Sequence, residues 1–247
     1  MKIFINCMKC LEQFGVPNIN FIEAEICDDG IYKTTCNHGH ETVTFLQQDK
    51  FEVLFDMGAM ALIDGYPREA VSSFAASLER FYEFCIKVFL LKRKISMNKF
   101  IDTWKLVSNQ SERQLGAFYF LYLDILDKIP KSIDKKQIEF RNKVIHKGYI
   151  PKYDEVIKYA DCVLKYMYDI LKELRCFCHE EMQQITLNEL TNMNKEFIKD
   201  GQITTKISTM CIATIINLAA SDECFAKKSF TEAIEDMKEY YLKFYSK

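Results

Sequence analysis

Two closely spaced pairs of metal-ligand side chains near the start of the chain constrain how that part can fold. They are Cys7-x-x-Cys10 and Cys36-x-x-x-His40, separated by about two dozen residues of short β-type sequence. Zinc ribbons are built in this way, because tetrahedral zinc takes four ligands from two tight turns. A segment of this length has too little apolar surface to fold by burial alone. The sequence therefore predicts a zinc-ribbon-like module over residues 1–48 that holds a structural Zn²⁺.

The fourth ligand of this site is one of two histidines. His38 and His40 lie on either side of Gly39, and Cys27 is a spare thiol in the same segment. We favour His40, because a glycine immediately before it frees the backbone for the tight turn. A catalytic metal is not expected, since no open three-ligand arrangement with a nearby base is present. The predicted ligands are therefore Cys7, Cys10, Cys36 and His40.

The rest of the chain has the periodicity of α-helices. Eight Gly and four Pro in 247 residues are few for a loop-rich β architecture. The segment from Phe118 to Leu126 is apolar nearly all round, which places it in the middle of a bundle. We expect a mainly α protein with an N-terminal β module and a helical bundle over residues 49–175. Helical spacing of apolar residues predicts the helices of the bundle over 51–65, 67–94, 98–107, 111–126, 133–146 and 153–174.

Capping residues mark the starts of three helices. Ser111-x-x-Gln114 and Ser229-x-x-Glu232 match the capping box, in which two backbone N–H groups are satisfied reciprocally. Ser132 is placed to cap the helix predicted over 133–146.

Residues 176–247 continue as a C-terminal helical extension that we expect to pack on the bundle. A helix over 180–198 and an apolar run over 207–220 precede the last helix. The group Cys176-x-Cys178-His179 has no second ligand pair, so we interpret it as thiols at the junction of two helices.

Composition and charge exclude several classes of protein. The formal net charge of −2 gives no whole-molecule attraction to nucleic acid or to an anionic membrane, so such a partner would need a local patch. Residues 1–10 lack the basic start and apolar run of a secretory signal, and the most apolar stretch, 117–126, is too short to span a bilayer. Ten cysteines in an intracellular protein favour metal ligands or buried thiols over disulfides. We expect a cytoplasmic protein without a membrane partner.

The run Arg141-Asn142-x-x-x-His146 is the most informative polar pattern in the chain. On a helix, Asn142 and His146 are four residues apart and share a face, and the long Arg141 side chain can swing toward the same place. Gly148 breaks the helix just after His146 and leaves the imidazole near a helix end. Three polar groups should therefore converge beside a core stripe that includes Val144.

This pattern resembles the signature of the HEPN superfamily, which is Arg, four to six residues, then His. The resemblance covers about residues 50–175, and the run from Ala75 to Phe81 is similar to the family's second helix, where an acidic residue often faces the Arg-His pair. Glu79 is therefore a candidate partner of Arg141 or His146. The resemblance implies a metal-independent endoribonuclease that works as a homodimer, with two Arg-His pairs brought together at the interface.

The residue types are consistent with this chemistry. Histidine titrates near neutrality, so His146 can take the proton from a ribose 2′-OH or give one to the leaving oxygen. Arg141 supplies a fork-shaped positive charge for the phosphate in the transition state. Asn142 would orient the imidazole or a phosphate oxygen. Because the attacking group is the 2′-OH, such a site should leave DNA uncut.

The charge around the motif agrees with an RNA partner. Between Lys128 and Lys152 there are eight basic residues against Asp134 and Glu139, so eight minus two gives +6 in a chain of net charge −2. A basic run is usually a solvated face, but this one surrounds the Arg-His motif. The basic residues are Lys128, Lys131, Lys135, Lys136, Arg141, Lys143, Lys147 and Lys152.

Three functions are compatible with these features. The leading hypothesis is an RNase of the toxin or anti-phage, abortive-infection type, in which the zinc module and the C-terminal helices recognise a trigger, an antitoxin or another regulatory protein. Family toxins that antitoxins modify have Tyr two residues after the His, whereas this chain has Gly148 there and Tyr149 next, which puts that control in doubt. The second hypothesis is a non-catalytic HEPN-type scaffold that binds nucleic acid or protein. The third treats Arg141 and His146 as structural, with Arg141 paired to an acid and His146 capping the helix.

Overall fold

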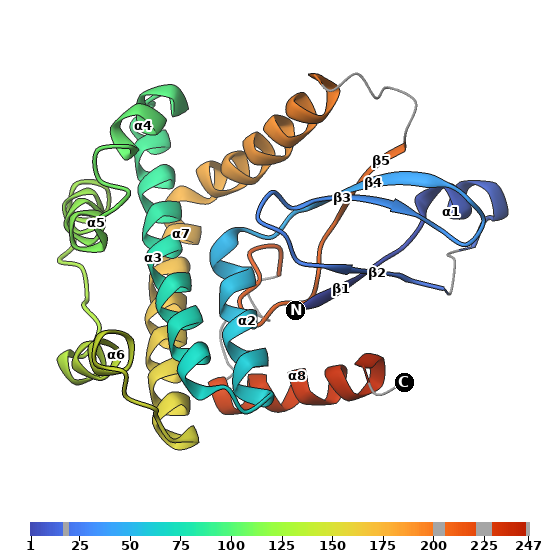
Figure 1. Cartoon of the computed structure of the whole chain (residues 1–247). Coiled ribbons are helices and arrows are strands. Elements are labelled where there is room, and N and C mark those ends of the chain that lie inside the picture. Colours follow the sequence, from blue (N-terminus) through green and yellow to red (C-terminus); the bar gives the residue numbers. More distant parts are fainter. Residues whose placement is uncertain (17–19, 200–205, 221–228, 246–247) are drawn as a thin grey trace. The chain divides into compact units, whose positions relative to one another are not determined.

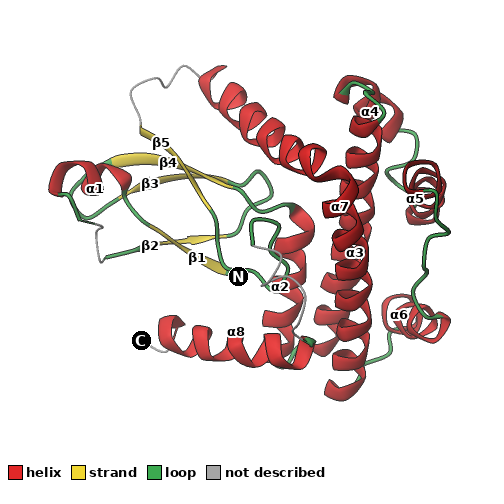
Figure 2. Ribbon diagram, turned by 180° about the vertical axis from the view of Figure 1, so that it is seen from behind, coloured by secondary structure: helices red, strands yellow, loops and turns green. Residues whose placement is uncertain are grey.

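The described part of the chain is dominated by helices. The computed structural model describes residues 1–16, 20–199, 206–220 and 229–245. Within these ranges it has eight helices and five strands (Figures 1 and 2). The prediction of a mainly α protein with a small N-terminal β part is confirmed. The chain divides into unit 1, Met1–Asp49 with Gln184–Ala213, and unit 2, Lys50–Gln183 with Thr214–Lys247.

Unit 1 contains two small sheets. Its elements are β1 (Lys2–Ile5), α1 (Met8–Phe14), β2 (Ile22–Glu25), β3 (Ile31–Thr35), β4 (Glu41–Leu46), the end of α7 (Tyr153–Lys199) and β5 (Lys206–Met210). Strands β1 and β2 pair antiparallel, and so do β3 and β4. Strand β5 pairs parallel to β4 along its other edge, with Val43 opposite Ile207. The predicted β runs at 20–26 and 42–46 correspond to β2 and β4.

The three-stranded sheet has its own apolar core. Val43 and Phe45 of β4 are buried and pack with Phe197 from the end of α7. Ile31 and Ile207 add partly buried side chains from the neighbouring strands. Unit 1 therefore buries apolar surface contributed by two distant parts of the sequence.

The C-terminal extension predicted as helical over 176–247 also contains a strand, β5. Residues 206–210 form a strand, and residues 211–220 contain no regular element. A strand is stable only beside a partner, and here the partner is β4, which lies far away in the sequence. Residues 176–247 do not form a separate segment, because 184–213 belong to unit 1 and the others belong to unit 2.

Unit 2 is a bundle of helices around α3. Its elements are α2 (Lys50–Ile63), α3 (Pro67–Lys92), α4 (Met97–Trp104), α5 (Ser111–Leu126), α6 (Lys135–Lys147), the first part of α7 and α8 (Phe230–Tyr245). Helix α3 contacts α2, α4, α5 and α6, and α7 runs beside it in both views (Figures 1 and 2). Helix α7 kinks at Cys178, where the backbone leaves helical geometry with φ −136° and ψ 28°. No helix within the described ranges is long and apolar enough to cross a membrane.

Aromatic side chains fill the core of unit 2. Phe55 of α2, Phe74 of α3 and Phe230 of α8 contact one another at centroid distances of 4.9–5.8 Å. A Cβ on Gly58 would lie 2.6 Å from the Phe74 ring, so the absence of a side chain lets α2 and α3 approach closely. Burial of such rings is the main favourable contribution to the folding of this bundle.

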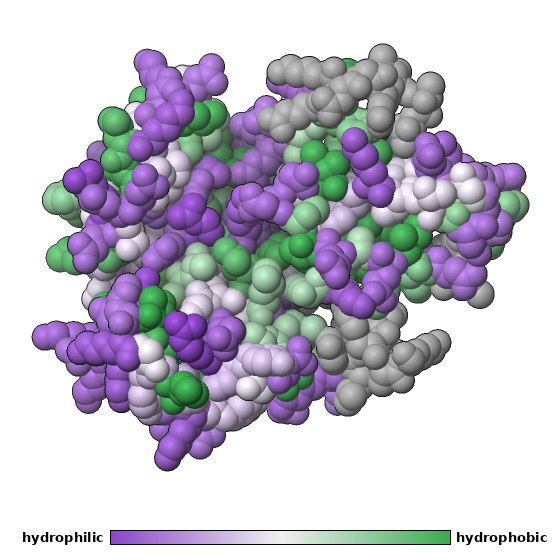
Figure 3. Space-filling view, in the orientation of Figure 1, coloured by the Kyte–Doolittle hydropathy of each residue, from purple (hydrophilic) through white to green (hydrophobic). Residues whose placement is uncertain are grey.

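Helix α5 lies at the edge of the bundle, and the prediction that it occupies the middle is wrong. It buries one stripe, Gln114, Phe118, Tyr122 and Leu126. Its other face leaves Phe120 77% exposed, and apolar side chains reach the surface beside α5 at the left edge of Figure 3. When a helix is apolar on all sides, its sequence does not show which side is buried. The middle of the bundle is taken by the longer α3, which contacts α2, α4, α5 and α6.

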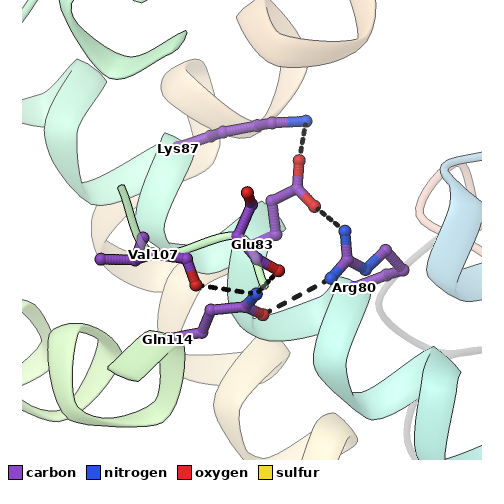
Figure 4. A network of polar contacts seen from close by, with 6 residues as sticks. Arg80, Glu83, Lys87, Val107 and Gln114 are labelled. Carbon is purple, nitrogen blue, oxygen red and sulfur yellow. Dashed lines mark hydrogen bonds and ion pairs between the residues drawn. The ribbon is translucent and has the colours of Figure 1, made fainter. Parts of the chain in front are cut away.

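A polar network ties the connection between α4 and α5 to α3 (Figure 4). Arg80 donates hydrogen bonds to Glu83 and to Gln114, and Glu83 also pairs with Lys87. Gln114 is buried and donates to the Ser108 carbonyl at 2.7 Å. The predicted capping role of Gln114 is therefore wrong, because its amide satisfies the loop that precedes the helix instead.

The other two cap predictions differ in outcome. In α8 the capping box is confirmed, since the Ser229 N–H donates to Glu232 and the Glu232 N–H donates to the Ser229 hydroxyl. Helix α6 starts two residues later than predicted. Asp134, not Ser132, caps it by accepting from the Lys136 N–H at 2.8 Å.

Candidate functional site

The four predicted metal ligands lie at two backbone turns of unit 1. Cys7 is the N-cap of α1 and Cys10 lies in its first turn. Cys36 and His40 occupy the turn between β3 and β4, and the Gly39 N–H donates to the Cys36 carbonyl at 2.9 Å. Gly39 has φ +77°, a conformation that suits glycine, as the sequence indicates.

The donor atoms of these residues lie close enough together to bind one tetrahedral ion. All four lie within 4.8 Å of one another. Two thiolates on one zinc ion lie about 3.8 Å apart, and a thiolate and an imidazole nitrogen about 3.6 Å. The observed distances are 3.7 Å from Cys10 Sγ to Cys36 Sγ and 3.4 Å from Cys10 Sγ to His40 Nδ1. This Cys₃His cluster could therefore hold a metal ion such as Zn²⁺.

The thiols are packed too closely to ionise together without a cation. Burial and hydrogen bonds to Cys7 and Cys36 raise the pKa of Cys10 to about 11. At Cys36, burial acts against ionisation, but backbone N–H groups of His40 and His38 donate to the sulfur, and the pKa falls below its ordinary value. A bound divalent cation would offset the repulsion among three thiolates.

The neighbouring candidates lie outside this cluster. His38 places Nδ1 3.3 Å from Cys10 Sγ, but its ring is exposed and lies 5.2 Å from the Phe14 ring. His40 is less exposed and approaches both Cys7 and Cys10, so the geometry favours it as the fourth ligand. Cys27 instead donates to the Asp29 carboxylate. The described residues offer no comparable cluster at Cys176, Cys178 and His179.

The polar residues of the Arg-His motif lie on α6 and α3 in unit 2. Arg141 donates to Glu79 Oε1 at 2.7 Å and to Asn142 Oδ1 at 3.0 Å. The Arg141 side chain is 24% exposed and that of Glu79 is 30% exposed. Solvent therefore reaches the ion pair and partly screens it. The structure thus brings Glu79, Arg141 and Asn142 together.

His146 lies in the last turn of α6 and is exposed. Among the described residues, no hydrogen bond or ion pair holds its imidazole or joins it to Arg141 or Asn142. Gly148 ends the helix with φ +68°, and its N–H donates to the Lys143 carbonyl. The fully buried Val144 fixes α6 to the bundle two residues before His146. A solvent-facing imidazole is thus carried on a well-anchored helix end.

A buried tyrosine of α7 lies behind the guanidinium. Tyr159 contacts the Phe140 ring at 5.7 Å and is buried. Burial is the largest cause of the raised pKa of its hydroxyl. The charge of Arg141 lowers this pKa and the charge of Glu79 raises it, so both groups lie near the hydroxyl. No sequence signal pointed to this residue, because it occupies a regular apolar position on the α7 stripe.

A second chain of contacts follows the end of α6. The Lys143 ammonium lies 3.5 Å from the centroid of the Tyr149 ring, and the Tyr149 hydroxyl donates to Glu155. Glu155 also accepts from the Lys152 N–H, and this bond is the main cause of its lowered pKa. Tyr149 is therefore held by both its ring and its hydroxyl.

Comparisons with protein-family models, with curated proteins and with solved structures each gave no match to this chain. The resemblance to the HEPN superfamily rests on the motif residues alone.

Proposed function

We propose that this protein is a metal-independent endoribonuclease of the HEPN type, with Arg141, Asn142, His146 and Glu79 in the reactive site. The observation that carries the proposal is a guanidinium held in place by a carboxylate, on the same helix as an exposed imidazole without a partner among the described residues. A helix-capping histidine would hydrogen-bond a carbonyl of the last turn, and His146 makes no such bond among the described residues. The unpartnered His146 therefore favours the nuclease over a purely structural role.

The proposed reaction is an attack of a ribose 2′-oxygen on the adjacent phosphorus. His146 accepts the 2′-OH proton or protonates the leaving 5′-oxygen, and a homodimer would supply one imidazole for each task. The P–O2′ bond forms, the P–O5′ bond breaks, and the products carry a 2′,3′-cyclic phosphate and a 5′-hydroxyl. Arg141 stabilises the negative charge on the phosphoryl oxygens. Glu79 acts through Arg141 as a positioning residue.

We further infer that Cys7, Cys10, Cys36 and His40 hold Zn²⁺ in a structural role. All four positions of the tetrahedron are taken by protein side chains, which leaves none for a reacting water. The metal would fix the fold of unit 1 and supply no step of RNA cleavage. The biological setting we propose is a toxin or anti-phage defence effector whose activity a second protein restrains.

The test is RNA cleavage by purified wild type and His146→Ala, with total RNA and a defined oligoribonucleotide, in buffer with and without EDTA. We expect wild type to cut in both buffers, to leave 2′,3′-cyclic phosphate ends and to spare a substrate with deoxyribose at the cut site. His146→Ala should lose at least about a hundredfold in rate, as expected for loss of a general acid or base.

The matched control is His179→Ala, which removes another exposed histidine of unit 2 that bonds Gln183. It should cut like wild type. Equal cleavage by the two variants would refute the assignment of His146. RNA binding without cleavage by wild type would favour a non-catalytic scaffold instead.

A further inference from the structure

The basic segment around α6 divides into paired and unpaired residues. Lys128 pairs with Glu173, Lys131 with Asp169, and Arg141 with Glu79. These cations are partly neutralised by acids of α7 and α3. Lys136, Lys143 and Lys147 on α6 are exposed and form no ion pair with any described residue.

These three lysines, which we call the lysine strip, follow one face of α6. Their spacings of seven and four residues are multiples of the helical repeat, so the side chains align along the axis, about 10.5 and 6 Å apart. Val144 lies on a neighbouring face of α6 and is buried in the core. The surface over α6, at the lower left of Figure 3, is accordingly hydrophilic.

His146 lies at the C-terminal end of the strip, next to Lys147. Lys143 is held in place because its ammonium sits on the Tyr149 ring, which Glu155 anchors. Glu139 is the acidic residue of the same exposed face. A row of ammonium groups at this spacing fits the repeated phosphates of an extended nucleic acid strand better than a single anion.

We propose that the lysine strip binds the phosphate backbone of RNA and lays the strand along α6 so that it passes His146. This inference rests on the proposed nuclease function and adds residues that bind substrate without reacting. Lysine contacts to phosphate carry no base information, so the strip supports affinity and orientation and not sequence choice.

The experiment measures binding of the full-length wild type to a fluorescent 2′-O-methyl oligonucleotide over a series of KCl concentrations. This probe keeps the phosphates but cannot be cut by 2′-OH attack. The test variant is Lys136→Gln/Lys143→Gln/Lys147→Gln. The control is Lys158→Gln/Lys165→Gln/Lys172→Gln, which removes three exposed lysines of α7 in the same unit.

We expect the strip variant to bind at least tenfold more weakly. The slope of log affinity against log salt should fall by about 2, since each lost contact to a single strand accounts for about 0.7. The control should bind like wild type, and cleavage of ordinary RNA by the strip variant should show a raised KM.

Unchanged affinity and salt slope in the strip variant would refute RNA binding by the lysine strip, even if RNA cleavage depends on His146. Equal weakening in both variants would also refute it, because the effect would then be net charge alone. If the strip variant binds at least tenfold more weakly but wild type cuts no RNA, the lysine strip is supported as a binding site and the nuclease function is refuted.

Discussion

At the scale of single residues, the pair of Glu79 and Arg141 has the greatest consequence for function. Arg141 is partly buried between α6 and α3, where a guanidinium without a partner would adopt several rotamers. One terminal nitrogen of the guanidinium donates to the Glu79 carboxylate, and the other donates to the side-chain oxygen Oδ1 of Asn142. The charge is thus pre-organised at little further entropic cost to substrate binding.

Glu79→Gln should lower RNA cleavage while leaving the fold intact. The neutral amide keeps the shape but loses the charge-assisted bond, so Arg141 becomes mobile, and kcat at saturating RNA should fall by roughly ten- to a hundredfold. The stability cost should stay at or below about 1 kcal/mol, because the pair is partly exposed. Cleavage kinetics and thermal melts measure the two effects.

The control for this substitution is Glu83→Gln on the same helix. Glu83 pairs with Arg80 and Lys87 and not with Arg141, so its loss should lower stability and leave kcat unchanged. A wild-type kcat for Glu79→Gln would show that the Glu79–Arg141 pair is only structural.

At the scale of secondary-structure elements, α2 has a role that its amphipathic pattern hides. Its buried Glu52 and Asp56 accept hydrogen bonds from the Leu218 and Ile215 N–H groups at 2.8 and 2.9 Å. Tyr168 donates to the Ile215 carbonyl at 2.7 Å. Side chains therefore satisfy the backbone of an irregular segment that has no strand or helix partner.

Asp56 should make the stability of the protein fall as pH rises. Burial raises its pKa to about 8, against the bond from the Ile215 N–H, which lowers it. In the unfolded chain the pKa is near 3.9. Between these values the native state holds a proton that the unfolded state has released, so unfolding becomes easier from about pH 4 to pH 8 and changes no further above that.

Asp56→Asn should remove this dependence, because the amide stays neutral and its oxygen still accepts from Ile215. The Tm of the variant should exceed that of wild type slightly in thermal melts at pH 5 and much more at pH 9. Asp64→Asn, at an exposed acid just after α2, should follow wild type at both values. A constant difference between Asp56→Asn and wild type across this range would contradict the prediction.

At the scale of the whole molecule, the chain forms two units whose sequence segments are interleaved. Unit 1 takes β5 and the end of α7 from the C-terminal part, and unit 2 resumes at Thr214. The metal cluster lies in unit 1, and the Arg-His motif lies in unit 2. A change at one site can therefore be followed separately from a change at the other.

Removing the metal should unfold unit 1 and spare unit 2. Wild type should copurify with one zinc ion per chain. Cys36→Ser should lose this ion, because it removes one of the four ligands. Hydrogen exchange should then rise in β1, β3, β4 and β5 and stay low in α3. Zinc content by mass spectrometry and amide exchange by peptide mapping measure both results.

Cys27→Ser is the control for the metal, since this exposed thiol lies in unit 1 but outside the cluster. This variant should keep its zinc and the wild-type protection of unit 1 against hydrogen exchange. Full protection of unit 1 in metal-free Cys36→Ser would show that the apolar core of the sheet is sufficient to fold it.

The sequence by itself determined the features that depend on local spacing. The ligand pairs at Cys7 and Cys36, the helix that ends at Gly148 and the capping box at Ser229 all follow from residues within a few positions of one another. Glu79 as a partner of Arg141 came from a resemblance, and the structure places the two side chains in contact.

Only the tertiary structure decided which faces are buried and which distant segments pair. Strand β5 is a strand because β4 offers it hydrogen bonds, α5 is peripheral because α3 has more neighbours, and Asp56 is buried because the backbone at Ile215 needs an acceptor. Each of these outcomes depends on contacts between residues far apart in the chain, and the free energy of such contacts leaves no periodic trace in the sequence.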